Sequence, residues 1–218
     1  RIDDGLLLEA LSELARADRA QGWIVGAGFE ARADLIEQGA RRLPLIGNGA
    51  ATLRRLRDAR SFFEALDAHG VAHPPVRLEW PDDASGWLLK DFAGSGGAQV
   101  QRAQGLPRRA LSATQVLQQE RHGATPMSAT FIADGRRARV LGCNRQLTRA
   151  MHDRPFVWCG VIGPVPVSAD VAAQVDAALT ALVPSFGLRG LGSLDFLGFE
   201  EDGRIEILEV NARVPASA

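Results

Sequence analysis

Residues 191–213 read LGSLDFLGFEEDGRIEILEVNAR, and this stretch decides how the rest of the chain is interpreted. Its two apolar runs flank the turn Asp202-Gly203, a pattern typical of an antiparallel hairpin. Side chains alternate along a strand, so Glu209 and Asn211 share one face, and hairpin pairing can bring Asp195 opposite them. We therefore expect three oxygen donors to converge on one face of a sheet.

Two carboxylates and one amide form a ligand set that suits magnesium. Mg²⁺ prefers oxygen donors, keeps several waters, and is usually held by one or two carboxylates together with substrate phosphates. A surface hairpin with solvated acids is the alternative interpretation of the same pattern. Two features favour the metal site: Asn211 stands two residues after Glu209, and Arg213 follows two residues later on the same line.

A second candidate site lies in WLLKDFAGSGGAQV, residues 87–100. A strand ends at Lys90, and the turn Gly94-Ser95-Gly96-Gly97 precedes the next strand. Glycines let backbone N–H groups approach phosphate oxygens closely, and a lysine adds a positive charge. A flexible hairpin connection would look similar without the lysine. The motif is not a Walker A sequence, because its lysine precedes the glycines and no helix follows directly.

The third candidate is the polar run QQERHG, residues 118–123. An extended backbone at this point could hydrogen-bond the edge of an adenine ring, and Glu120 could accept hydrogen bonds from ribose hydroxyls. Taken alone, the run is equally compatible with a polar surface loop.

The remaining sequence predicts two kinds of architecture. Up to about residue 50, helices alternate with short apolar runs at Trp23–Val25 and Leu43–Ile46, which favours a small parallel sheet. The later strands are joined by turns such as Asp134-Gly135, which favours antiparallel pairing and an α+β fold. The predicted helices are 4–20, 31–40, 50–57, 58–69 and 169–182, and the predicted strands are 87–90, 98–102, 128–133, 139–141, 194–199 and 205–210.

Composition excludes several classes of partner. The 218 residues are 46% hydrophobic and 23% charged, as in ordinary globular domains, and their net charge is -1. We therefore expect no nucleic-acid partner and no attraction to anionic membranes. No apolar run approaches the roughly 20 residues that span a bilayer, and Cys143 and Cys159 lack the spacing of a zinc or disulfide framework, so a cytoplasmic location is expected. The chain starts without Met and stops just after the Asn211 motif, so we expect a fragment.

Taken together, and in their order along the chain, the three candidate sites resemble the ATP-grasp superfamily over roughly residues 23–218. The resemblance implies an ATP-grasp fold, with α/β and α+β parts that clasp a nucleotide. It divides the chain into a partial, parallel-sheet pre-ATP-grasp (substrate) domain, residues 1–57, a connecting helix with the lid lobe, residues 58–118, and a C-terminal lobe with the metal site, residues 119–218.

The resemblance also implies a role for each candidate residue. Cofactors would be ATP and Mg²⁺, with Mn²⁺ as an alternative metal. By resemblance Lys90 binds phosphate, Glu209 bridges two metal ions, and Arg213 holds the acyl phosphate or the substrate carboxylate. Arg145, in CNRQL, is a further candidate to bind an anionic group. The lid loop would be Gly94, Ser95, Gly96 and Gly97, the nucleoside would be held by Gln118, Gln119 or Glu120, and the metal ligands would be Asp195, Glu209 and Asn211.

The implied activity is that of an ATP-dependent carboxylate–amine ligase working through an acyl phosphate, with a small-molecule acid and amine as substrates. The pieces GAGFE, LIGNG and PFVWCGVIGP are similar to a group of small bacterial and archaeal ATP-grasp proteins that includes tyramine–glutamate ligase. Addition of an amino acid such as glutamate in cofactor or small-metabolite synthesis is thus one expectation. Dimers are common in this family, so a homodimer is another.

Two departures from the family pattern leave other functions open. Where the family carries a first ATP-binding lysine, RDARSFF offers only Arg57, Ala59 and Arg60, so a regulatory ATP-binding protein without ligase activity is an alternative. Ala212 also stands where the family prefers proline. A dinucleotide-binding oxidoreductase is the third hypothesis, from Gly26-Ala27-Gly28 after an apolar run. It lacks a third glycine, and no acidic residue clearly closes the next strand.

Overall fold

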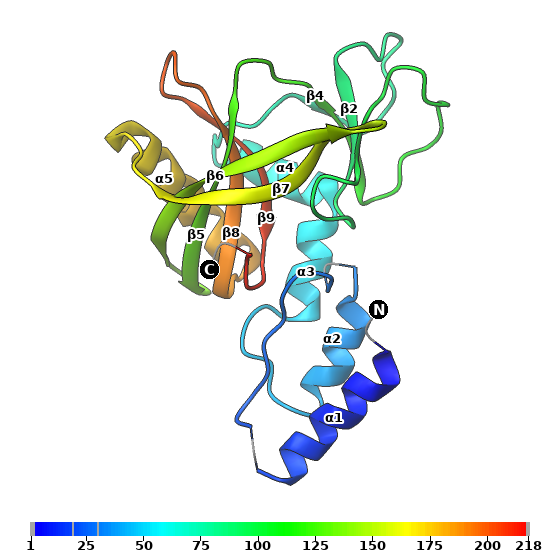
Figure 1. Cartoon of the computed structure of the whole chain (residues 1–218), viewed down its shortest axis with the longest axis vertical. Helices are drawn as coiled ribbons and strands as arrows, with labels where there is room; N and C mark the ends of the chain where they lie inside the picture. Colours follow the sequence, from blue (N-terminus) through cyan, green and yellow to red (C-terminus); the bar gives the residue numbers. More distant parts are fainter. Residues whose placement is uncertain (1–2, 19, 30, 217–218) are drawn as a thin grey trace.

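Two antiparallel sheets and five helices make up the described part of this computed structural model, which comprises residues 3–18, 20–29 and 31–216 (Figure 1). All strand pairs in both sheets are antiparallel. The first sheet has the order β1 (Val76–Arg77), β4 (Gln115–Gln119), β2 (Trp87–Asp91), β3 (Val100–Arg102). The second has the order β7 (Arg154–Val165), β6 (Ala138–Met151), β5 (Thr125–Asp134), β8 (Arg189–Gly198), β9 (Ile205–Asn211).

The first part of the chain is helical, and its first two helices lie below the two sheets in Figure 1. Asp3 caps the first helix by accepting a 3.0 Å hydrogen bond from the Leu6 amide, and Asp58 caps the fourth by accepting one of 2.7 Å from Ser61. The predicted helices are confirmed, with ends shifted by a few residues; Arg19 and Glu30 lie outside the described residues. The four helices are α1 (Asp4–Arg16), α2 (Ala33–Ala40), α3 (Ala50–Arg57) and α4 (Ala59–Ala68).

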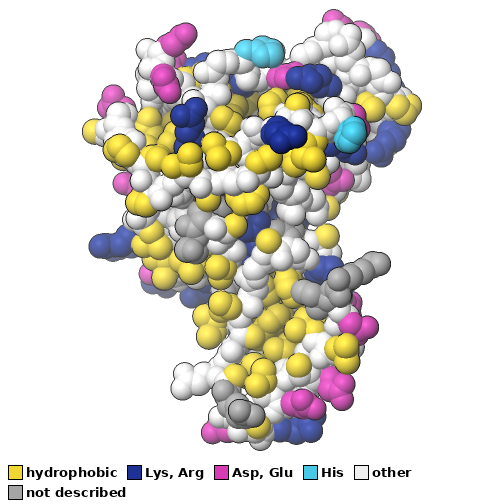
Figure 2. All heavy atoms as spheres, in the orientation of Figure 1, with side chains coloured by type: hydrophobic (Ala, Val, Ile, Leu, Met, Phe, Trp, Pro, Cys, Tyr) yellow, Lys and Arg dark blue, Asp and Glu magenta, His cyan; other side chains and the backbone are white. Residues whose placement is uncertain are grey.

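The small parallel sheet predicted for this part is reduced to one isolated bridge. Trp23 pairs in parallel with Leu45, and no other strand joins them among the described residues. Parallel strands are stable when both faces are covered, whereas Ile24 and Ile46 beside the bridge are 60% and 59% exposed. Figure 2 shows hydrophobic side chains gathered on this lower part of the molecule. The described residues around Gly26 therefore lack the parallel sheet that a dinucleotide-binding fold requires.

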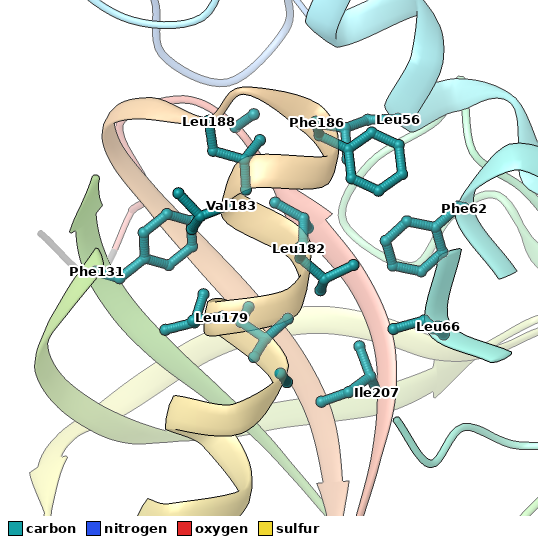
Figure 3. Close-up of a cluster of buried hydrophobic side chains, with 14 of the residues drawn as sticks. Leu56, Phe62, Leu66, Phe131, Leu179, Leu182, Val183, Phe186, Leu188 and Ile207 are labelled. Atoms are coloured by element: carbon teal, nitrogen blue, oxygen red, sulfur yellow. The ribbon is translucent and has the colours of Figure 1, made fainter. Parts of the chain in front are cut away.

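Helix α5 (Ala169–Phe186) covers the back of the second sheet and builds the main core (Figure 3). Ser168 caps its start, and Gly187 ends it in the left-handed conformation at φ 64°. The helix was predicted to end at residue 182, but it continues through Pro184 because its last turn is buried. In Figure 3, α5 packs between Phe131 of β5 and Phe62 of α4. The sheet face opposite α5 is left to carry polar side chains.

Asn48 ties the helical part to the strands of the second sheet. Its side chain is buried, donates 2.7 and 3.1 Å hydrogen bonds to the carbonyls of Arg189 and Ala212, and accepts one of 2.8 Å from the Arg189 amide. The loop before α3 is therefore fixed beside the end of β9. None of the described helices is long and apolar enough to cross a lipid bilayer.

Three strands were missed by the sequence patterns, and one was underestimated. β1 and β4 were not predicted, β7 was missed altogether, and β6 was expected only over 139–141, although it extends from Ala138 to Met151. The pairing of β6 with β7 shifts register in three places, which breaks the strict alternation that identifies a strand. Figure 1 shows these two strands reaching across from the second sheet toward β2.

Candidate functional site

A cavity of about 320 Å³ lies between the two sheets. β8 and β9 form its floor, β2 and β4 form its roof, and the loop between β2 and β3 reaches its rim. Asp195, Glu209 and Asn211 line the floor, and Lys90 lines the roof opposite them. The most informative residues of the sequence therefore face one space.

The three predicted oxygen donors meet on one face of the β8–β9 hairpin. Asp195 pairs with Glu209 across the two strands, and Ser193 pairs with Asn211. The Asn211 amide donates hydrogen bonds of 3.0 Å to Asp195 and 3.3 Å to Glu209. The apolar side chains that alternate with them are buried on the α5 side, so the pattern of inward and outward residues fixes where the acids point.

Lys90 forms an ion pair with one of these acids. Its Nζ lies 2.7 Å from Glu209 Oε2 and donates a 3.2 Å hydrogen bond to the Leu208 carbonyl. The side chains of Lys90 and Glu209 are 7% and 13% exposed. A pair this enclosed is screened weakly by solvent, so its partners are costly to separate unless other charges replace them.

Arg57, at the end of α3, is a second cation close to this pair. It is 8% exposed, and its guanidinium donates a hydrogen bond to the carbonyl of Phe92 at the end of β2. Its charge acts on Glu209. Arg57 thus lies in the region where the sequence lacks the lysine expected from the family resemblance, whereas Ala59 is fully buried in the core.

The two acids differ in protonation. Burial and the charge of Glu209 raise the pKa of Asp195 to about 7, against weaker opposing effects from Gln146, Lys90 and Ser193. Burial also acts to raise the pKa of Glu209, but the charges of Lys90 and Arg57, with hydrogen bonds from Lys90 and Asn211, outweigh it and hold that pKa below its ordinary value. Glu209 is therefore charged at neutral pH, while Asp195 titrates there.

The glycine loop and the polar run 118–123 both contribute to the cavity in part. Ser95, Gly96 and Gly97 line it, while Gly94 instead packs beside Gln99. Of the three residues expected to hold a nucleoside, Gln118 and Gln119 line the cavity. Glu120 does not, because its carboxylate forms a 3.0 Å ion pair with Arg102.

The two predicted arginines end up in different places. Arg213 lines the cavity, and its guanidinium donates a 3.5 Å hydrogen bond to Asn211 Oδ1 and one of 3.3 Å to the Val214 carbonyl. Arg145 is exposed on β6 and does not line the cavity, whereas the next residue, Gln146, does. The site of the structure thus includes Arg213 and leaves Arg145 out.

Sequence patterns missed the side wall of the cavity. Gln146 and Thr148 of β6 line it, together with three apolar residues of β7, Phe156, Trp158 and Val161. The polar residues Asn144, Gln146 and Thr148 alternate along β6, and this alternation was the one signal that could have identified the wall.

The chemistry of the donor set can be compared with what a metal needs. Among the described residues, no three His, Cys, Asp or Glu side chains are grouped so as to hold a metal ion. The β8–β9 site has two carboxylates and adds an amide, which is a smaller protein ligand set. Such a set fits a hard cation that receives its remaining oxygens from phosphates and water, as Mg²⁺ does.

Residues 56–217 match the ATP-grasp domain family. No curated protein matches the chain. The solved structures that share its fold include three at 16% identity, a level that shows the fold alone.

Two of these structures are biotin carboxylases with TM-scores of 0.73. One is a Campylobacter jejuni biotin carboxylase–β-γ-ATP complex, with 96% of this chain and 52% of that chain covered. The other is the biotin carboxylase domain of Hydrogenobacter thermophilus 2-oxoglutarate carboxylase with MgADP, ADP and bicarbonate, with 96% and 51% covered. The third is an L-amino acid ligase from Bacillus licheniformis, with a TM-score of 0.67 and 97% and 53% covered. The chain thus spans about half the length of these structures.

Proposed function

This chain belongs to the ATP-grasp family, and from that membership and the cavity between its sheets we infer that it is an ATP-dependent carboxylate–amine ligase. One observation carries the proposal: Asp195, Glu209 and Asn211 converge on the cavity floor, directly below Lys90. Oxygen donors and a buried cation that face one another across a cleft are what a metal-bound polyphosphate requires. The domain division at residues 57 and 118 is part of the same proposal.

Asp195, Glu209 and Asn211 would hold Mg²⁺. Asn211 turns its amide nitrogen toward both acids, and a half-turn of that amide would present its oxygen to a cation instead. Bound Mg²⁺ would neutralise phosphate charge and orient the phosphoryl group.

The rest of the cavity suits the other parts of ATP. Lys90 and the backbone of Ser95, Gly96 and Gly97 would bind the phosphates, as a point charge and a set of N–H donors respectively. Gln118 and Gln119 lie at the end where the chain crosses from the first sheet to the second, and they would hold the nucleoside. Arg57 would add a second cation from α3.

The reaction would proceed in two steps. A carboxylate oxygen of the acid attacks the γ-phosphorus of ATP, the bond to the β,γ-bridging oxygen breaks, and ADP leaves an acyl phosphate. The nitrogen of the amine then attacks the acyl carbon. The bond from that carbon to the phosphate oxygen breaks, phosphate leaves with the bonding electrons, and the amine proton passes to solvent. Arg213, which donates a hydrogen bond to Asn211, would hold the carboxylate or the acyl phosphate that it becomes. An amino acid such as glutamate is one substrate to try first.

A screen of acid and amine pairs for ADP release tests the proposal. We expect ADP only when ATP, a divalent cation, an acid and an amine are all present, and we expect Glu209→Ala and Lys90→Ala to abolish the signal. Glu201→Ala is the matched control, because Glu201 is an exposed acid on the turn of the same hairpin. Unchanged turnover in Glu209→Ala would contradict the site assignment. Calorimetric titration with MgADP reports binding independently of turnover, and binding without turnover for any pair would favour the regulatory alternative.

A further inference from the structure

The β6–β7 hairpin leaves its own sheet and reaches the other one. In Figure 1 it crosses from the second sheet toward β2, and β7 contacts β3 at its far end. We call the part of this hairpin from Gln146 to Val161 the arm. Its cavity face carries no charged side chain among the cavity-lining residues, only Gln146, Thr148, Phe156, Trp158 and Val161.

The arm touches the glycine loop through its backbone. The Trp158 amide donates a 2.9 Å hydrogen bond to the Gly96 carbonyl. β7 is an edge strand, so this N–H would otherwise have pointed to solvent. Trp158 also lines the cavity.

Gly97 packs against the arm more closely than any other residue type could. A Cβ added at Gly97 would lie 2.8 Å from the Phe156 carbonyl carbon, and closer still to its oxygen. Gly97 has φ 74°, and its neighbour Gly96 has a similar φ of 68°. A Cβ at Gly96 would meet nothing within 4 Å. Of these two glycines, both left-handed, only Gly97 is therefore required by the contact with the arm.

We propose that the arm is a positioning element of the nucleotide site: Phe156 and Trp158 hold the glycine loop over the phosphate end of the cavity, so that its N–H groups are in place before ATP arrives. The inference rests on the proposed function for the identity of the ligand, whereas the contact between the arm and the glycine loop is independent of that function. A loop held in its binding conformation loses less freedom on binding, which increases affinity without any new contact to the ligand.

Paired substitutions separate the contact from backbone strain. Gly97→Ala and Gly96→Ala share the cost of placing a side chain at positive φ, but only Gly97→Ala collides with Phe156. We expect hydrogen exchange of the Trp158 amide to accelerate about ten-fold or more in Gly97→Ala relative to Gly96→Ala. The affinity for MgADP, measured by calorimetry, should fall about ten-fold further in Gly97→Ala, the equivalent of one lost hydrogen bond.

A second pair serves if Gly97→Ala loses its cooperative thermal transition. Trp158→Ala removes the ring and keeps the amide, whereas Trp158→Pro also removes the N–H, at an edge-strand position that tolerates proline. Weaker MgADP binding in Trp158→Pro than in Trp158→Ala is expected.

The outcomes distinguish the two proposals. Equal amide exchange in the two glycine variants, or equal affinities in both pairs while the unmodified chain binds MgADP, would overturn the role of the arm. Failure of the unmodified chain to bind MgADP would overturn the proposed function, while the exchange data would still report on the contact between arm and loop.

Discussion

Two hairpins of the same sheet border the cavity, and they are built differently. The β8–β9 hairpin rests on α5, and its alternate side chains, such as Leu194 and Ile207, are almost completely buried. The β6–β7 arm leaves that support, and Leu147, Met151 and Trp158 along it are 40%, 45% and 38% exposed. Charged groups that must keep a fixed geometry lie on the supported hairpin. Neutral groups that touch the loop lie on the unsupported one.

This division has a physical reason. Two half-buried acids 3.0 and 3.3 Å from a shared amide keep their places only if the backbone beneath them cannot yield. A wall that meets a loop through one backbone hydrogen bond tolerates more movement, and opening it exposes no buried charge. The difference predicts that the two hairpins respond unequally to the same perturbation.

The largest expected difference is in stability, and one matched substitution tests it. Leu194→Ala removes a fully buried side chain under the site, so we expect the free energy of unfolding to fall by about 2–5 kcal/mol. Leu147→Ala makes the same change on the arm, where the loss should stay below about 1 kcal/mol. Urea denaturation of both variants measures this. Equal losses would mean that the arm has a core of its own.

The β8–β9 hairpin could be predicted from the sequence because its main cues agreed. Its turn is Asp202-Gly203, and Asp195, Glu209 and Asn211 each stand between apolar residues. A single register shift, between Asp195 and Phe196, interrupts its pairing. The assignment of its three side chains as ligands stays a prediction. Strand alternation predicted that these side chains converge, and the structure confirms that they do.

The arm could not be predicted for the opposite reason. Register shifts near Cys143, Leu147 and Arg149 break the period of two, and Gly160 and Gly163 interrupt the apolar pattern of β7. Its contact with the glycine loop joins residues some sixty positions apart, which no local pattern encodes. The same limit affected single side chains: Glu120 pairs with Arg102 across the sheet, and no spacing rule indicates that partner.

The next expected effect concerns pH and the supported hairpin alone. Because the pKa of Asp195 is raised to about 7, the folded state holds a proton that the unfolded chain, with a pKa of about 3.9, releases. The contribution of Asp195 to the stability of the metal-free protein should therefore be most favourable below about pH 4, and it should be lost as pH rises from about 4 to 7.

Asp195→Asn removes that dependence without changing the shape of the side chain. We expect it to stabilise the metal-free protein at pH 8 by on the order of 2 kcal/mol, since the cavity leaves Asp195 partly solvated, and to change little at pH 4. Thermal melts in EDTA at the two pH values provide the measurement. An equal shift at both pH values would show that the pKa of Asp195 is not raised in the folded protein.

A smaller effect should link nucleotide and metal through the Lys90–Glu209 ion pair. ATP alone must draw Lys90 away and leave Glu209 buried without its cation, and Mg²⁺ alone must compete with Lys90. When both bind, the nucleotide phosphates pair with Lys90 and Mg²⁺ pairs with Glu209. We expect ADP to bind at least about ten-fold more tightly with Mg²⁺ than with EDTA, and Mg²⁺ affinity to rise by the same factor with ADP. Lys90→Met should reduce this coupling, and identical affinities with and without Mg²⁺ would contradict it.

The smallest expected effect lies where the two hairpins meet, at Gln146. Its side chain hydrogen-bonds Asp195 and thereby lowers that pKa, and it also donates a 3.4 Å hydrogen bond to the Met127 carbonyl. Gln146→Ala should raise the pKa of Asp195 further, so that Mg²⁺ binding, followed by calorimetry across pH 6–9, shifts to higher pH and weakens about three-fold near neutrality. Arg145→Ala is the matched control, because Arg145 is the adjacent residue on β6 and lies outside the cavity lining. A larger effect from Arg145→Ala than from Gln146→Ala would mean that Arg145, and not Gln146, points into the cavity. It would thereby contradict the orientation of β6 on which the proposal for the arm depends.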